Sequence, residues 1–327
     1  MNRKKDLLAF LLAAVLLLSV SWGLSWVLIP VRENYGSMWD SYRQEETPID
    51  VLCFGSSVAY CDLAPGYIWQ ESGLRTFVMA APEQTMPFTY YAVREACRTQ
   101  SPQVIAVEMR GMFFQKYQNY TKPNLTYMPP GLNRAAATLN GGERSEWFGS
   151  FFPLYNYHYR WTEVERPECS ARLHPQPDPA AGYTVLTDRY TSGEIFTDDT
   201  LTADSDTYRE NLSYLKKICS FCEKRDITLL LYLAPSCSKV PEAALAALRQ
   251  DVEGLGQALY DLNEIAPSLD IVVEEDYYDF LHFNLYGAEK FSHWFAHFLL
   301  EEGGAVPTPG WEDVWNERVA YLENSKA

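Results

Sequence analysis

The chain is poor in positive charge. Its 327 residues include 27 Lys and Arg against 43 Asp and Glu, and the formal net charge is −16. Three of the basic residues and one of the acidic residues lie in the first 30, so the rest of the chain carries −18. A nucleic-acid-binding groove needs a surplus of Lys and Arg to neutralise phosphates. We therefore exclude a nucleic-acid partner and interpret the acidity mainly as a source of solubility.

The chain also lacks the clustered ligands of a metal site. Cys219-x-x-Cys222 has no second pair nearby, and His293 and His297 are not accompanied by the glutamate of a helical zinc motif. The sequence therefore implies no metal and no other cofactor. Its seven cysteines are an odd number, so at least one thiol is unpaired, and the pattern leaves open which of the others form disulfides.

Only one apolar run is long enough to cross a membrane. Residues 7–29 are uncharged over 23 positions. As a helix with a rise of ~1.5 Å per residue, this run spans ~34 Å, which is enough to cross a bilayer. Three basic residues at 3–5 precede it, and the positive-inside rule keeps such a flank in the cytoplasm.

We therefore expect residues 1–30 to form a retained signal anchor and residues 31–327 to form an extracytoplasmic domain. The alternative is a signal peptide cleaved at the small residues 19–21, because its densest apolar stretch has signal-peptide length. Cleavage would secrete the same domain. In both cases the working part of the chain lies outside the cytoplasm.

After the anchor, short apolar runs alternate with helical patterns. Apolar runs typical of buried parallel strands lie at 49–54, 76–80, 104–109, 228–234 and 269–273. Apolar residues spaced three and four apart predict helices at 64–72, 86–99, 206–225, 241–264 and 287–301. This alternation predicts an α/β fold, a three-layer sheet with helices on both faces. Ligands of such sheets bind beyond the carboxyl ends of the strands.

The alternation is interrupted by an insertion at about 111–204. Within it, residues 113–161 hold 13 aromatic residues in 49 positions, about twice the density of the whole chain. We expect a lobe over the active face whose aromatic residues, including Phe113-Phe114 and Phe151-Phe152, pack in a core rather than form a sugar-stacking platform. A helical tail at about 305–327 is expected to pack back onto the domain.

Two motifs supply the chemistry. Gly55-Ser56-Ser57 ends the first strand, and Asp279-x-x-His282 lies near the end of the chain. A serine hydroxyl attacks only if an imidazole takes its proton, and the imidazole works best when a carboxylate holds its other nitrogen. We therefore identify Ser57, His282 and Asp279 as candidate nucleophile, base and orienting carboxylate. Either motif alone is commonly structural, and a nucleophile elbow is disfavoured because an elbow serine follows several strands.

These motifs resemble the SGNH/GDSL hydrolase superfamily, and in particular its membrane-anchored envelope branch, which includes the alginate-acetylation and D-alanine-transfer proteins. The first family block, Gly-x-Ser, matches Gly55-Ser56-Ser57, and Asp279-x-x-His282 with the following Phe-Asn-Leu-Tyr-Gly-Ala matches the last. The resemblance covers about residues 47–110 and 205–302. It implies a flavodoxin-like three-layer sheet and a Ser57 nucleophile whose backbone N–H also donates to the oxyanion.

The sequence departs from the family in its two middle blocks. The glycine of the second block is replaced in residues 80–84, Ala-Ala-Pro-Glu-Gln, and the Gly-x-Asn-Asp of the third block by Val-Glu-Met-Arg-Gly at 107–111. The loss of one oxyanion donor reduces the rate by on the order of 10²–10³. The replacement donors or substrate contacts are therefore sought among four residues: Gln84, Glu83, Arg110 and Ser56.

The resemblance implies a two-step acyl transfer. The acyl group passes from a donor to the serine and then to a sugar or polyol hydroxyl, or to water. We predict a serine acyltransferase that O-acylates, for example O-acetylates, an envelope polysaccharide or polyol polymer and receives acyl groups from a multi-pass membrane donor protein. The alternatives are an esterase that removes such groups and, in another class, a catalytically silent envelope scaffold.

Overall fold

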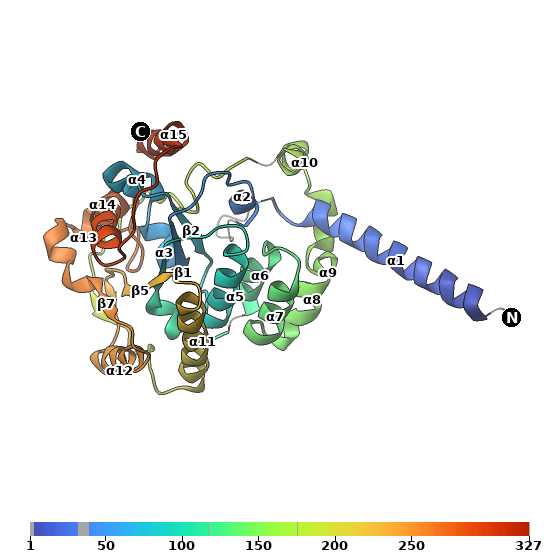
Figure 1. Ribbon diagram of the computed structural model, residues 1–327, viewed down its shortest axis with the longest axis horizontal. Helices are drawn as coiled ribbons and strands as arrows, with labels where there is room; N and C mark the ends of the chain where they lie inside the picture. Colours follow the sequence, from blue (N-terminus) through green and yellow to red (C-terminus); the bar gives the residue numbers. More distant parts are fainter. Residues whose placement is uncertain (1–2, 32–38, 117, 175, 327) are drawn as a thin grey trace.

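A five-stranded parallel sheet forms the centre of the protein. The computed structural model describes residues 3–31, 39–116, 118–174 and 176–326 (Figure 1). The strands are β1 (Val51–Gly55), β2 (Thr76–Ala80), β3 (Val104–Glu108), β5 (Thr228–Leu233) and β7 (Leu259–Asp261). They lie in the order β2-β1-β3-β5-β7, and each neighbouring pair is parallel. This is the strand order of flavodoxin-like doubly wound sheets, and the predicted α/β class is confirmed.

Helices cover both faces of the sheet (Figure 1). One layer contains α5 (Met86–Ala96), α11 (Asp206–Glu223) and α12 (Glu242–Glu253). The other contains α3 (Ser57–Asp62), α4 (Pro65–Ser72) and α14 (Leu285–Glu301). In β1, Leu52 and Phe54 face the first layer, and Val51 and Cys53 face the second. The strands are apolar throughout because successive side chains point to opposite faces and both faces are buried.

The helix expected at 241–264 is shorter than predicted. α12 ends at Glu253, and Gly254 and Gly256 follow it, the latter with a φ of 71° in the left-handed region. Glycine adopts this conformation without a steric penalty, so it commonly ends a helix. The chain therefore turns and returns to the sheet as β7.

The strand expected at 269–273 is absent, and β7 takes the edge position instead. A 3-10 turn, η5 (Ala266–Leu269), leads to Asp270, whose φ of 52° breaks any extended run. The chain then enters α13 (Val273–Asp276). The apolar residues of this segment therefore pack around a turn, which a short apolar run does not distinguish from a strand.

The insertion between β3 and α11 consists mostly of short helices. They are α6 (Gln118–Thr126), α7 (Leu132–Gly141), α8 (Trp147–Phe151), α9 (Pro153–Tyr157) and α10 (Arg166–Leu173), with 3-10 turns that include η3 (His158–Thr162). α7 packs on α5, and α9 packs on α1 (Arg3–Leu28), so this part lies on the side from which α1 projects (Figure 1). The expected burial of Phe151-Phe152 is wrong, because each side chain is 41% exposed.

The last part of the insertion approaches the carboxyl edge of the sheet. There β4 (Phe196–Thr197) pairs with β6 (Ser238–Lys239), and the Phe196 ring lies 5.5 Å from that of Phe280. At the C-terminus, α15 (Glu312–Asn324) packs on α4 and buries Trp315.

At the other end of the chain, α1 is long and apolar enough to span a membrane or to serve as a signal sequence. Its apolar window is not buried by the rest of the described protein. The seven cysteines are all free thiols, so the disulfides left open by the sequence do not form in this structure.

Candidate active site

Ser57 lies at the carboxyl end of β1. It is the first residue of α3, and Ser56 caps this helix by accepting the Val58 N–H at 3.4 Å. The Ser57 N–H is thus one of the first amides of a helix, which have no intrahelical acceptor. This position places Ser57 at the edge of the sheet where ligands of such folds bind.

Gly55 makes this sharp exit from the strand possible. Its φ is 152°, and a Cβ at this position would lie 2.8 Å from the Cβ of Glu108 and 3.1 Å from that of Ala59. A larger residue would therefore push β1 away from β3 or displace the start of α3. The glycine of the motif has a steric role and the serine at its end a chemical one.

A tight loop between α13 and α14 holds the other two candidates. Asp279 Oδ1 accepts the backbone N–H groups of Leu281 at 2.7 Å and His282 at 2.9 Å. This is the self-capping geometry that Asp favours in turns. An antiparallel bridge between Tyr277 and Phe283 closes the base of the loop. The D-x-x-H spacing therefore folds the carboxylate back onto its own histidine.

The structure brings Ser57, His282 and Asp279 together. His282 Nδ1 lies 2.9 Å from Asp279 Oδ2, and His282 Nε2 lies 2.8 Å from Ser57 Oγ, across 225 positions of the chain. A carboxylate only accepts, so Nδ1 carries the proton in this contact and Nε2 is left to accept the serine proton. These are the two hydrogen bonds that a serine nucleophile requires.

The electrostatics fit this assignment. Burial raises the pKa of Asp279, but the hydrogen bonds from the His282 ring and from two backbone N–H groups outweigh it, and the net pKa lies below the usual value. Asp279 therefore stays ionised and stabilises an imidazolium at His282. The side chains remain reachable from solvent, with 17% of His282 and 34% of Asp279 exposed.

Of the four residues proposed as oxyanion or substrate contacts, Gln84 and Arg110 make their side-chain hydrogen bonds elsewhere. Gln84 Nε2 donates to Thr89 Oγ1 at 3.0 Å. The Arg110 guanidinium donates to the carbonyl and hydroxyl of Ser238 at 2.8 and 2.6 Å. Their side chains are thus held by the protein.

The other two of these residues lie nearer to the ends of β1 and β2. Ser56 Oγ lies 3.5 Å from Glu108 Oε2, a long contact between two buried groups. Glu83 occupies the turn after β2 with a φ of 41°, and burial raises the pKa of its carboxyl. In the turn after β2, the Ala81 and Gln84 N–H groups already donate to the Gly55 and Ala81 carbonyls at 3.4 and 3.2 Å, which leaves the Ser57 N–H at the start of α3 as the candidate backbone donor.

Sequence reasoning missed two buried acids beside the triad. Glu108 ends β3 and accepts the Arg110 N–H at 3.0 Å, and burial raises its pKa to about 7. Asp62 ends α3 and accepts the Phe283 N–H at 2.8 Å, and burial holds its pKa well above the usual value. Glu108 was visible as a charged residue at a strand end, whereas nothing in the sequence distinguishes Asp62.

The two other histidines considered for a metal site belong to a surface contact. Glu71 on α4 lies 3.1 Å from His293 Nδ1 and 2.8 Å from His297 Nε2, both on α14. The contact therefore ties two helices of the same layer together. Its residues lie on the outer side of α4 and α14 and take no part in the triad.

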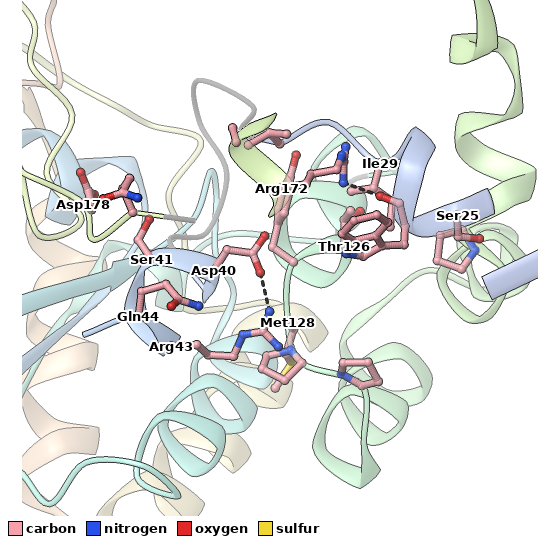
Figure 2. Close-up of a pocket in the computed structure, with 18 of the residues that line it drawn as sticks. Ser25, Ile29, Asp40, Ser41, Arg43, Gln44, Thr126, Met128, Arg172 and Asp178 are labelled. Atoms are coloured by element: carbon pink, nitrogen blue, oxygen red, sulfur yellow. Dashed lines mark hydrogen bonds and ion pairs between the residues drawn. The ribbon is translucent and has the colours of Figure 1, made fainter. Parts of the chain in front are cut away.

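A cavity of about 640 Å³ lies between α1 and the insertion, and its lining does not include the triad (Figure 2). Its wall holds an ion pair between Arg43 and Asp40 at 2.6 Å (Figure 2). Size alone does not identify an active site, because a reaction also needs a nucleophile with its base. We therefore place the candidate active site at the triad.

Comparison with known proteins adds no family assignment. No family model matches the chain, and no curated protein sequence matches it. The functional argument consequently depends on the geometry of the site.

Proposed function

We propose that this protein is a serine acyltransferase of the cell envelope, related to the membrane-anchored branch of the SGNH/GDSL superfamily. One observation carries the proposal. A continuous chain of hydrogen bonds runs from Ser57 Oγ through the His282 ring to the Asp279 carboxylate, with contacts of 2.8 and 2.9 Å. This arrangement can activate the hydroxyl at neutral pH, because the proton has an acceptor and the acceptor has a partner that stabilises its positive charge.

The reaction has two steps. His282 Nε2 takes the hydroxyl proton as Ser57 Oγ attacks the acyl carbonyl, and the backbone N–H of Ser57 donates to the oxyanion that forms. The imidazolium then protonates the leaving oxygen of the donor, which leaves an acyl-serine. In the second step His282 deprotonates an acceptor hydroxyl, which attacks the acyl-serine. The acyl group passes to the acceptor, and the proton returns to Ser57.

The acceptor decides between transferase and esterase. An apolar N-terminal helix supports a transferase, because a tether to the bilayer raises the effective concentration of the domain near a membrane-borne acyl donor. The solvent exposure of His282 and Asp279 supports the esterase, because water can then reach the acyl-serine. We favour transfer onto a polysaccharide or polyol hydroxyl.

An active-site probe tests the nucleophile. A fluorophosphonate reacts with an activated serine, so the full-length chain in detergent is expected to form one adduct, at Ser57. Ser57→Ala is expected to abolish it, and Ser56→Ala, the matched control one position away, is expected to retain it. An adduct at Ser56, or one that survives Ser57→Ala, would remove the basis of the proposal.

Deleting the gene distinguishes the three functional classes. Loss of ester-linked acyl groups from envelope polymers, restored by the wild type and not by Ser57→Ala, identifies the transferase. An increase in these groups on deletion identifies the esterase. If Ser57→Ala restores the wild-type level, the protein acts as a scaffold and the catalytic proposal fails.

A further inference from the structure

Exposed aromatic side chains gather on the part of the insertion nearest to α1. They lie on α8, α9 and η3 and at the junction of α8 with α9. We call them the aromatic platform: Phe148, Phe151, Phe152, Tyr155, Tyr159 and Trp161, which are 58, 41, 41, 61, 56 and 75% exposed. In the described chain beyond α1, about half of the large exposed apolar side chains lie within residues 132–173. A concentration of this kind on a protein surface marks an interaction site.

The rings of the platform support each other. The Phe148 ring lies 5.1 Å from that of Phe152 and 5.2 Å from that of Tyr155. At its edge, Trp161 has three quarters of its surface exposed. Phe148, Phe152 and Tyr155 therefore form one aromatic cluster rather than isolated side chains, and burial of the exposed rings on a partner would be favourable.

The same part of the insertion is fastened to the last turns of α1. Ser25 and Leu28 of α1 are buried, and the Arg160 guanidinium donates to the Leu28 carbonyl at 2.7 Å. Arg172 donates to the Trp26 carbonyl, and its guanidinium lies 5.8 Å from the centroid of the Trp26 ring. These contacts fix the platform relative to the axis of α1.

The length of α1 places this junction at a membrane surface. A bilayer core of ~30 Å takes ~20 helical residues. Counted from Leu7, the first residue after the charged N-terminal turn, these residues end near Trp26. Arg160 and Arg172 therefore hold α1 where it leaves the hydrocarbon core. α8 and α9 lie along the edge of the domain from which α1 projects (Figure 1).

We propose that the aromatic platform lies in the headgroup region of the outer leaflet, so that the domain contacts the bilayer at two places. Trp and Tyr favour this region because their rings combine an apolar body with a polar group, and the Phe side chains add apolar contact with the acyl chains. The two contacts fix the orientation of the domain on the membrane. The proposal depends on α1 spanning the bilayer and is independent of the acyl-transfer reaction.

Spin labelling of the full-length chain in vesicles tests the proposal. The labelling sites are introduced into a Cys169→Ser variant, because Cys169 is the one cysteine whose side chain is exposed. A nitroxide is then attached at Tyr155→Cys or, independently, at Trp161→Cys. Val272→Cys is the matched control, because Val272 is 45% exposed and lies beside α13, on the opposite side of the domain from α1 (Figure 1).

The readout is the collision rate of each label with oxygen, which concentrates in lipid, and with a water-soluble nickel complex. In vesicles of phosphatidylcholine and phosphatidylglycerol, the platform labels are expected to show an oxygen-to-nickel ratio several-fold above that at Val272. Equal ratios at the platform and at Val272 would overturn the proposal. Protection of the platform labels from both reagents would also overturn it, because a second copy of the chain would then cover the patch.

Discussion

Asp62 accepts a hydrogen bond from the backbone N–H of Phe283, with its Oδ1 at 2.8 Å. Phe283 directly follows His282, and Asp62 is the last residue of the short helix that begins at Ser57. One helix therefore carries Ser57, the candidate nucleophile, at its first residue and supports the loop of His282 at its last. The distance between Ser57 Oγ and His282 Nε2 therefore depends on the short helix α3.

Replacement of Asp62 tests this positioning role. Asp62→Asn keeps an oxygen that accepts the Phe283 N–H, and it imitates the protonated acid that burial favours. We expect this variant to react with a fluorophosphonate at close to the wild-type rate. Asp62→Ala removes the acceptor, and a shift of the histidine by ~1 Å is expected to slow labelling by ~10²-fold. Wild-type labelling by an Asp62→Ala protein with an unchanged melting temperature would contradict the role.

The triad is expected to act as a unit. Ser57→Ala and His282→Ala should each abolish acyl transfer, and the double variant should be no slower than either, because neither residue has an activated partner without the other. The measurement is the turnover of an activated acyl ester together with the melting temperature of each variant. Additive losses would mean that the two residues act independently.

Asp279→Asn separates orientation from charge in the same site. An amide can donate to Nδ1, which would leave the proton on Nε2, where it cannot accept from Ser57. The expected loss in kcat is on the order of 10⁴-fold, with little change in KM. A loss in stability that accounts for the whole effect would instead assign Asp279 to loop capping, since it also accepts the N–H groups of Leu281 and His282.

Local patterns predicted four of the five strands and the residues of the candidate triad, and long-range packing decided the rest. β2 was predicted to the residue because an apolar run with turns at both ends has one good solution in a buried sheet. The run at 269–273 has a similar composition but no free strand position, since β7 pairs with β5 at that edge. Competition for a place in the sheet is not visible in the local sequence.

The candidate catalytic residues were identifiable from the sequence, and the contacts that support them were not. Ser57, His282 and Asp279 belong to motifs whose residue types and spacing indicate a candidate triad. Asp62 contacts the backbone N–H of Phe283, 221 positions away, so this contact exists only in the fold. The exposure of Phe151 and Phe152 was missed for a related reason. Aromatic pairs usually bury in water-soluble cores, whereas these lie next to α9, which packs on a helix that is apolar enough for a membrane.

Gly55→Ala is expected to damage both folding and reactivity. The φ of 152° is unfavourable for any residue with a side chain, and the new Cβ would lie 2.8 Å from the Glu108 Cβ in a fully packed strand pair. Strain of this kind costs about 1–3 kcal/mol. The melting temperature of Gly55→Ala should be lower than that of Gly73→Ala, the control variant. Gly73 also has a left-handed φ, of 72°, but a Cβ added there would lie 3.6 Å from its nearest neighbour.

Glu108 gives the protein a pH-dependent stability. Burial raises its pKa from 4.5 to about 7, although hydrogen bonds from the Arg110 N–H and the charge of Arg110 act in the opposite direction. The folded protein therefore keeps a proton that the unfolded chain releases between these two values. The contribution to the free energy of unfolding is complete below pH 4.5 and is lost as the pH rises through 7.

Glu108→Gln should remove this dependence. Glutamine is neutral at every pH and keeps an oxygen for the Arg110 N–H, so the variant avoids a buried charge whose cost is on the order of 3 kcal/mol. Its melting temperature should exceed that of the wild type by several degrees at pH 8, and the difference should shrink toward pH 5, where the wild-type residue is protonated. Asp198→Asn is the control for the loss of a negative charge beside Arg110. It neutralises a partly exposed carboxylate whose Oδ2 lies 3.7 Å from the Arg110 guanidinium. A difference between Glu108→Gln and wild type that stays constant from pH 5 to pH 8 would show that Glu108 is ionised throughout this range.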